Sequence, residues 1–282
     1  MNLLKLRSLI ENFFIEDIGE QDITTDLIFS EDTDGEIVFL AKEDGVFCGE
    51  EIIRTGFQLL NNQITSRVFV KDGESIEIGQ QLAVVSGKIA DLLKGERVVL
   101  NLVQRMSGIA TLTQKTVTTL NSDHTKICDT RKTTPGLRML EKYAVRCGGG
   151  FNHRFGLYDG VMIKDNHISF AGSIANAVDA VRKKAGHMVK IEVETETAAQ
   201  VVEAVNAGAD VIMFDNRTPA EIKEFIQLVP STIITEASGG IQLSNIADYR
   251  DTGVQYISLG FLTHSYKALD ISVRVLVNKE EE

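Results

Sequence analysis

The sequence contains few cysteines, no long apolar run and no surplus of positive charge. Its three cysteines, Cys48, Cys128 and Cys147, are odd in number and far apart, which excludes a disulfide framework and a CxxC metal pair. No stretch approaches the roughly 18 to 20 apolar residues that span a bilayer. A formal net charge of -11 disfavours general binding to nucleic acids or anionic membranes, because their phosphates would be repelled. We therefore expect a small-molecule partner, no nucleic acid and no membrane.

The length and the N-terminus are typical of a globular enzyme. With 282 residues, of which 43% are hydrophobic, the chain can form one large domain or one large and one small. Near the N-terminus Lys5, Arg7 and Glu11 interrupt the apolar positions, a pattern that predicts an amphipathic helix and not a secretory signal. We expect a cytoplasmic protein.

From Lys126 onward, strand-like and helix-like segments alternate. The predicted strands are residues 126–130, 160–166, 188–194, 210–216, 232–240 and 255–263. Helical periodicity lies between most of them, at residues 173–186, 197–208, 219–229 and 243–253. This alternation predicts a parallel sheet. Because the region is much shorter than the roughly 250 residues of a complete eight-fold barrel, we expect an incomplete βα barrel, with a doubly wound sheet as the alternative.

The chain before residue 109 has a different pattern. Short strands are predicted around 35–43, 66–73 and 81–87, followed by a long helix from Lys88 to Gln104. We therefore expect an α+β sandwich domain at 1–108 and the barrel domain at 109–269, with the boundary near 107–111. Residues 270–282 are expected to return and pack on the first domain.

Charged and small polar residues lie at the carboxyl ends of the predicted strands. They are Arg131 and Lys132, Lys164 to His167, Glu192 and Glu194, Asp215, Glu236 to Gly240, and Gly260 with Thr263 and His264. In parallel sheets and βα barrels the loops at this end converge on one cleft. Residues 129–167 also hold seven cationic side chains against four carboxylates, which predicts a site for an anion.

Seven motifs follow one another along the chain. They are DTRKTTPG at 129–136, KYAVRCGGGFNHR at 142–154, IKDNH at 163–167, EVE at 192–194, IMFDN at 212–216, EASGGI at 236–241 and LTHS at 262–265. In this order they resemble the quinolinate phosphoribosyltransferase family. The resemblance extends from the first helix to about Asp270. It implies an N-terminal α/β sandwich, an incomplete seven-stranded barrel and a homodimer with composite active sites.

The resemblance also implies a reaction and a cofactor. Members of the family transfer a phosphoribosyl group from phosphoribosyl pyrophosphate to quinolinate, with Mg²⁺, and release pyrophosphate and CO₂ to give nicotinate mononucleotide for de novo NAD biosynthesis. Quinolinate is a dicarboxylate, so its site needs several cations. Arg131 and Arg154 can each grip a carboxylate through two parallel N–H groups, while Lys132 and Lys164 act as compact charges.

The expected site residues fall into two overlapping groups. The catalytic residues are Lys132, Lys164, Glu194 and Asp215, and the substrate-binding residues are these four together with Arg97, Arg131, Thr133, His153, Arg154, Ser238, Gly239, Gly240 and Gly260. His153 is expected to contact a substrate carboxylate. By the resemblance, Arg97 reaches the site of the neighbouring subunit. The roles of His167 and Arg105 stay open, as does association of the dimers into hexamers.

Three predictions concern the carboxylates and the phosphate. Glu194 and Asp215 end adjacent strands, so they are expected to hold Mg²⁺ or the ribose hydroxyls. Glu192 is expected to pair with Lys190. Residues 238–240 follow a strand and precede a predicted helix, so their N–H groups and the helix N-terminus are expected to bind the 5′-phosphate, with Gly260 on the neighbouring loop.

Three other functions are compatible with parts of the pattern. The first is a phosphoribosyltransferase of the same fold that acts on nicotinate, or the related protein associated with molybdate transport. The second is a Schiff-base lyase that uses Lys164 at a strand end. The third is a sensor that binds a sugar phosphate without turnover. The motifs at 129–136 and 151–154 supply cations for two carboxylates and favour quinolinate.

Overall fold

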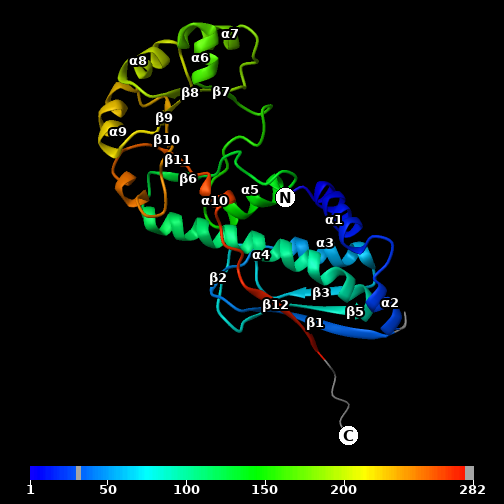
Figure 1. Ribbon diagram of the computed structural model, residues 1–282. Helices are drawn as coiled ribbons and strands as arrows, with labels where there is room; N and C mark the ends of the chain where they lie inside the picture. Colours follow the sequence, from blue (N-terminus) through cyan, green and yellow to red (C-terminus); the bar gives the residue numbers. More distant parts are fainter. Residues whose placement is uncertain (30–32, 277–282) are drawn as a thin grey trace. The chain divides into compact units, whose positions relative to one another are not determined.

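The computed structural model describes residues 1–29 and 33–276 and divides into two compact units (Figure 1). The first contains residues 1–112, 139–149 and the segment from Tyr266 onward, and the second contains 113–138 and 150–265. None of the helices in these described residues is both long and apolar enough to span a membrane.

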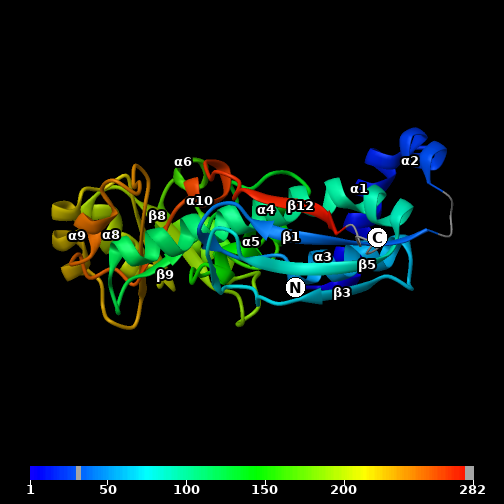
Figure 2. The ribbon, with the colours of Figure 1, turned by 90° about the horizontal axis from the view of Figure 1, so that it is seen from below.

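The first unit is built on a four-stranded antiparallel sheet with strand order β12-β1-β5-β3 (Figure 2). Its strands are β1 (Asp34–Ala41), β3 (Thr65–Val68), β5 (Gln81–Lys88) and β12 (Ile271–Leu276), and β2 (Gly45–Val46) pairs separately with β4 (Ser75–Ile76). Its helices are α1 (Leu3–Ile18), α2 (Ile23–Ile28), α3 (Glu50–Leu60) and α5 (Arg138–Cys147), together with the first part of α4 (Ile89–Leu120).

Apolar periodicity explains how the first unit packs. On α1 the residues Leu6, Ile10 and Phe14 recur every four positions and are buried, which gives the helix one core-facing stripe. Phe39 of β1 and Phe57 of α3 pack edge to face, with ring centroids 6.2 Å apart. The core of this unit therefore lies between the sheet and its helices.

The C-terminal segment adds an edge strand to this sheet. Strand β12 pairs antiparallel with β1, in a register that places Ile271 opposite Ala41. Ile271 is buried, which ties the strand to the core. Residues 277–282 of the segment that was expected to return lie outside the described residues.

Helix α4 is longer than the sequence predicts. It was expected to end at Gln104 and instead continues to Leu120, through residues 107–111. Gly108 does not break the helix but allows close packing, because a Cβ atom there would lie 2.2 Å from the carbonyl oxygen of Lys267. Gly108, which lies in the predicted domain boundary, is therefore a position where a helix packs closely against another segment.

The second unit is built on a six-stranded parallel sheet with strand order β6-β11-β10-β9-β8-β7. The strands are β6 (Lys126–Cys128), β7 (Val161–Ile163), β8 (Ile191–Thr195), β9 (Val211–Asp215), β10 (Ile234–Ser238) and β11 (Tyr256–Ser258). Five of them fall within the predicted segments and β8 extends one residue beyond its segment, so the six predicted strands are confirmed. In Figure 1, helices α6 (Asp165–Ala171), α7 (Ile174–Arg182), α8 (Ala198–Asn206) and α9 (Pro219–Phe225) lie along the outer side of strands β7 to β10.

Two details of the second unit differ from expectation. The described residues give six strands, and a seventh is not confirmed: Phe151 forms only an isolated parallel bridge to Cys128. The helix predicted at 243–253 is reduced to a 3₁₀ turn at Ile246–Tyr249, because the Asn245 side chain accepts from the backbone N–H of Gln242 and donates to the carbonyl of Gly240. Two further short elements are the 3₁₀ turn Ile226–Leu228 and helix α10 (Phe261–His264).

Candidate active site

The carboxyl ends of neighbouring strands bring three predicted site residues to one edge of the parallel sheet. Glu194 pairs in register with Met213 of β9, and Ser238 of β10 pairs with Asp215 at the end of β9. The strands are mostly apolar and buried, although β8 and β10 also carry the buried acidic residues Glu192 and Glu236 within the strand. Glu194, Asp215 and Ser238 therefore follow one another along this edge.

Lys164 bridges two of these strand ends. It follows β7, and its ammonium lies 2.8 and 3.1 Å from the two carboxylate oxygens of Glu194. Burial raises the pKa of Asp215, while Lys164 and then Lys132 oppose the shift through their positive charges. Two lysines thus face one half-buried carboxylate.

His167, whose role the sequence left open, has a local structural contact. Its Nδ1 accepts a hydrogen bond of 2.9 Å from the backbone N–H of Lys164, at the start of helix α6. This bond satisfies an N–H group that the helix leaves without an intrahelical partner. His167 therefore fixes the backbone from which the Lys164 side chain projects.

The loop after β6 rests on the loop after β11. The Thr263 hydroxyl donates to the carbonyl oxygen of Lys132 at 2.8 Å. A Cβ atom on Gly260 would lie 2.7 Å from Cδ of Lys132, so the lysine stem passes over a position that has room only for glycine. Gly260 therefore acts on the site through Lys132.

The loop at residues 238–240 is shaped by two glycines and by the loop after β9. Gly239 and Gly240 have φ angles of +84° and +66°, and Asn216 donates its backbone N–H to the carbonyl of Ser238 at 2.8 Å. A Cβ atom on Gly239 would lie 2.2 Å from Oδ1 of Asn216. The helix N-terminus predicted after this loop is absent, because only the 3₁₀ turn follows. Any phosphate contact must come from the loop itself.

Arg131 and Arg154 form a pair of like charges. Nε of Arg131 is buried and has no hydrogen-bond partner among the described residues, whereas Arg154 donates to the carbonyl of Gly160 at 2.9 Å. Burial, followed by the positive charge of Arg131, lowers the pKa of Arg154. An unpaired buried donor beside a second guanidinium is unfavourable unless an anion completes the site. The pair has the positive charge to bind carboxylates.

Thr133 is held within the same loop. Its hydroxyl accepts from Nε of Arg138 at 2.9 Å, and Arg138 also donates to the carbonyl of Phe155 at 2.9 Å. Arg138 therefore connects the segment that carries Arg131 and Thr133 with the segment that carries Arg154.

His153 is oriented by the protein on both sides of its ring. Its backbone N–H donates to the buried carboxylate of Asp129 at 2.9 Å, and its Nδ1 accepts from the backbone N–H of Arg154 at 2.8 Å. Nδ1 therefore carries no proton, and Nε2, 3.0 Å from the Glu192 carboxylate, carries it and donates. A contact from this Nε2–H to a substrate carboxylate would require the ring to leave Glu192.

Sequence reasoning placed Glu192 and Glu236 at strand ends but missed their contact with His153. Glu192, expected to pair with Lys190, lies beside His153 instead, and Glu236 lies 3.6 Å from the same Nε2. Burial, with the nearby charge of Glu192, raises the pKa of Glu236 to about 8, so this side chain is protonated at neutral pH. The available signal was an acidic residue in the middle of an otherwise apolar parallel strand.

Arg97 and Arg105, both on helix α4 of the first unit, have separate surroundings. Arg97 is exposed on α4. Arg105 donates through Nε to the buried carboxylate of Glu141 at 3.1 Å, and its guanidinium carbon lies 4.9 Å from the ring centroid of Tyr266. Arg105 is thus a structural contact of its own unit.

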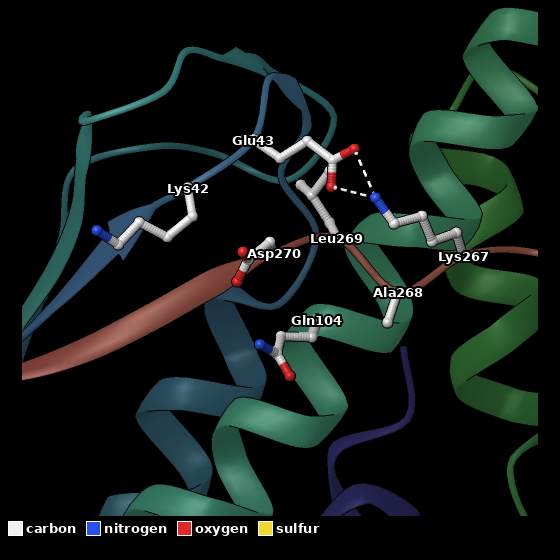
Figure 3. Close-up of a pocket in the computed structure, with 7 residues that line it drawn as sticks. All are labelled: Lys42, Glu43, Gln104, Lys267, Ala268, Leu269 and Asp270. Atoms are coloured by element: carbon white, nitrogen blue, oxygen red, sulfur yellow. Dashed lines mark hydrogen bonds and ion pairs between the residues drawn. The ribbon is translucent and has the colours of Figure 1, made fainter.

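A cavity of about 440 Å³ in the first unit is lined by none of the predicted site residues. Figure 3 shows the Lys267 ammonium facing both carboxylate oxygens of Glu43 at its rim, with Gln104 and Asp270 nearby. With one ion pair already formed and no buried unpaired polar atom among its lining residues, the cavity has no feature of a catalytic site.

Comparison with known proteins identifies the same family over the whole chain. The family model described as Quinolinate phosphoribosyl transferase, C-terminal domain, matches residues 109–274, and its N-terminal counterpart matches residues 22–107. A probable nicotinate-nucleotide pyrophosphorylase (carboxylating) of Bacillus subtilis is 57% identical over 99% of this chain and 96% of its own length. A mitochondrial quinolinate phosphoribosyltransferase (decarboxylating) of Nicotiana tabacum is 38% identical over 96% of this chain and 82% of its own length.

Solved structures agree with these matches. NadC from Streptococcus pyogenes superposes with a TM-score of 0.94 at 38% identity, covering 98% of this chain and 99% of its own. The nicotinate-nucleotide pyrophosphorylase from Francisella tularensis gives 0.93 at 35% identity, covering 98% of each chain. The matches to both domain models and to full-length relatives agree with the cationic side chains described above at the strand ends. The chain belongs to the quinolinate phosphoribosyltransferase family.

Proposed function

We propose that this chain transfers a phosphoribosyl group from phosphoribosyl pyrophosphate to quinolinate with decarboxylation, giving nicotinate mononucleotide, CO₂ and pyrophosphate. The names of its relatives and both domain models support this reaction. The observation that carries the assignment to a site is the Arg131–Arg154 pair, with its buried unpaired Nε. A planar dicarboxylate neutralises two adjacent guanidiniums better than a monocarboxylate can.

The pyridine dicarboxylate is assigned to the loops after β6 and around residue 154. Arg131 and Arg154 bind its carboxylates, and Arg138 supports them through Thr133. His153, held by Glu192, positions the backbone of Arg154. Because Glu236 is protonated, the interior behind His153 carries less negative charge and repels the bound dianion less.

The sugar diphosphate is assigned to the neighbouring strand ends. Lys132 and Lys164 supply positive charge beside Asp215, which supports their placement against the pyrophosphate. The loop at 238–240 presents backbone N–H groups to the 5′-phosphate, and Gly260 keeps the path of Lys132 clear.

The residues assigned to magnesium fit that ion. Glu194 and Asp215 offer hard oxygen ligands, and Mg²⁺ commonly binds one or two carboxylates together with phosphate oxygens and water. In this structure Glu194 faces Lys164, and Asp215 accepts from the Asn216 amide at 2.6 Å; these two carboxylates would hold the ion. The bound ion supplies charge that stabilises the departing pyrophosphate.

Catalysis is assigned to positioning and electrostatics. The arginines hold quinolinate so that its ring nitrogen attacks the anomeric carbon while the C–O bond to pyrophosphate breaks, and the lysines stabilise the negative charge that leaves. The nitrogen then carries a positive charge. When the adjacent carboxylate leaves as CO₂, its bonding electron pair stays on the ring carbon, where the positive charge on nitrogen stabilises it, and a proton from solvent then completes the C–H bond of nicotinate mononucleotide. No covalent enzyme intermediate is needed.

The assembly is proposed by family resemblance. We infer a homodimer in which Arg97 enters the partner's site, and we place the protein in the cytoplasm. Exposure of Arg97 on α4 supports a role toward a second chain. The Phe151 bridge next to β6 supports a seventh barrel position at that edge of the sheet.

A direct assay tests the function. Purified protein is incubated with Mg²⁺, quinolinate and phosphoribosyl pyrophosphate, and nicotinate mononucleotide and CO₂ are measured. Nicotinate replaces quinolinate in a parallel reaction and is expected to be a much poorer substrate, because it leaves one guanidinium unpaired. Equal or faster turnover of nicotinate would reject the assignment, as would binding of the sugar diphosphate without product.

Chelation tests the metal assignment. With excess EDTA the rate should fall to background, and added MgCl₂ should restore it. Asp215→Asn should raise the MgCl₂ concentration needed for half-maximal activity, because it removes one carboxylate ligand. An unchanged magnesium requirement in this variant would reject Asp215 as a ligand.

A further inference from the structure

Two of the three cysteines meet in the first unit although 98 residues separate them in the sequence. Cys48 precedes helix α3, and Cys147 is the last residue of helix α5. Their sulfur atoms lie within 4.8 Å of each other. Cys48 is fully buried, whereas Cys147 is partly exposed. Such a pair has one thiol that solvent can reach and a second one directly behind it.

The backbone on both sides of the pair is held in place. The Asp72 carboxylate accepts from the backbone N–H groups of Gly49 and Glu50 at 2.7 and 3.0 Å, and from the Tyr143 hydroxyl at 2.8 Å. One carboxylate therefore fixes the residues that follow Cys48 and the turn of α5 that precedes Cys147. These contacts hold the two thiols close to each other without a covalent bond between the sulfur atoms.

The same contacts favour thiol chemistry over metal binding. Asp72 lies within 4.8 Å of both sulfur atoms but already accepts three hydrogen bonds, and a metal ion would have to break some of them. Leaving the backbone N–H groups at the start of α3 without partners would destabilise that helix. A bond between the two sulfur atoms leaves this network intact.

The two thiols have unequal acidity. The adjacent Cys48 thiol is the largest cause lowering the pKa of Cys147, and the Tyr143 hydroxyl contributes in the same direction. Burial raises the pKa of Cys48. The thiolate is the reactive form of cysteine, so the exposed member of the pair is the better nucleophile.

We propose that Cys147 and Cys48 form an oxidation site that hydroperoxides convert reversibly into an intramolecular disulfide. The Cys147 thiolate attacks a peroxide oxygen, the O–O bond breaks, and a sulfenic acid and hydroxide (or alkoxide) form. The Cys48 thiol then loses its proton, and its sulfur attacks the sulfur of Cys147 and displaces hydroxide, which leaves as water. The pair gives two electrons to the peroxide, and a dithiol reductant returns them.

The test uses the reduced full-length protein and hydrogen peroxide. After removal of reductant, the protein is treated with one to ten equivalents, unreacted thiols are alkylated, and intact mass and non-reduced peptides are measured. We expect loss of two of the three thiols, a decrease of about 2 Da before alkylation and a linked Cys48–Cys147 peptide. Dithiothreitol should reverse all three changes. Three thiols that remain alkylatable, or a link that involves Cys128, would overturn the proposal.

Single substitutions assign the two roles. Cys128→Ser is the matched control and should still form the link. Cys48→Ser should leave a Cys147 sulfenic acid that dimedone labels, and Cys147→Ser should give neither product, since Cys48 is buried. Equal dimedone labelling of Cys48 in the last variant would overturn the order of attack.

Two further measurements need no substitution. Closing a loop of 98 intervening residues should raise the melting temperature of the oxidised protein, and dithiothreitol should lower it again. Elemental analysis decides between a disulfide and a metal: one zinc per chain that prevents oxidation would overturn the proposal. None of these readouts depends on the phosphoribosyl transfer.

Discussion

At the residue scale, we expect the ion pair of Lys164 and Glu194 to matter for activity and to contribute little to stability. The Lys164 side chain is 43% exposed, so its ion pair contributes at most about 1 kcal/mol to stability. Lys164→Ala should lower kcat/KM by about 100-fold or more, because it removes a cation that faces developing negative charge. Its melting temperature should stay within a few degrees of wild type. Steady-state kinetics and thermal unfolding measure the two effects.

A second lysine–glutamate pair provides the control. Lys267 lies 3.0 Å from Glu43 in the first unit, and neither residue is assigned to the site. Lys267→Ala should retain the activity of wild type. If the two variants lost activity equally, Lys164 would have no special catalytic role.

Glu236 should make stability depend on pH. Its pKa is about 8 in the folded protein and near 4.5 when unperturbed, so between these values the folded state keeps a proton that the unfolded chain releases. The stabilisation is complete below pH 4.5 and is lost as pH rises through 8. The slope approaches about 1.4 kcal/mol per pH unit. Urea titrations of wild type and Glu236→Gln between pH 5 and 8.5 measure it.

The Gln variant should show a weaker decline over this range, because it has no proton to lose. The Ser258 hydroxyl, which donates to Glu236, retains an acceptor in the amide oxygen. If the two stability curves ran parallel from pH 5 to 8.5, Glu236 would not be the titrating group.

The sequence predicted the positions of those site residues that directly follow a strand in the chain. Arg131 and Lys132 follow β6, and Lys164 follows β7, as the strand pattern indicated. The contact of His153 with Glu192 and Glu236 was missed, because these residues come from three separate segments. Their association depends on sheet order, in which β9 lies between β8 and β10. No local pattern encodes that order.

At the scale of elements, alternation and capping predicted most of the second unit. All six of its strands were found, because apolar runs bounded by polar and glycine residues are strong signals. The prediction of a helix at 243–253 was wrong, because a hydrogen bond of the Asn245 side chain with the nearby backbone competes with helical hydrogen bonds. The predicted end of α4 was also wrong, because the sequence does not show that Gly108 packs against the Lys267 carbonyl in the folded protein.

Helix α9 gives a prediction at this scale. The Thr218 hydroxyl accepts from the backbone N–H of Glu221, and the Glu221 carboxylate accepts from the N–H of Thr218, which forms a capping box. Thr218→Ala should lower the free energy of unfolding by about 1 kcal/mol. Thr218→Ser keeps the hydroxyl and serves as the control. Urea unfolding measures both, and equal losses would show that the hydroxyl is not the cause.

At the scale of the whole molecule, hybrid dimers test the proposed composite site. Arg97→Ala and Lys164→Ala should each be nearly inactive alone. Co-expressed with different tags and isolated as hybrids, they should recover about half of wild-type activity, because one of the two sites then has both residues intact. Product formation by the purified hybrid is the measurement. A hybrid as inactive as its parents would place Arg97 in the site of its own chain.

The pairing of β1 with both β5 and β12 also has a consequence for biosynthesis. The ribosome makes β1 before β12, so one side of β1 has no partner until the 229 residues between the two strands have been made. An unpaired strand edge favours association with other chains. We expect the nascent polypeptide to depend on a chaperone that shields this edge, and polysome-bound chains to aggregate more readily than the released protein.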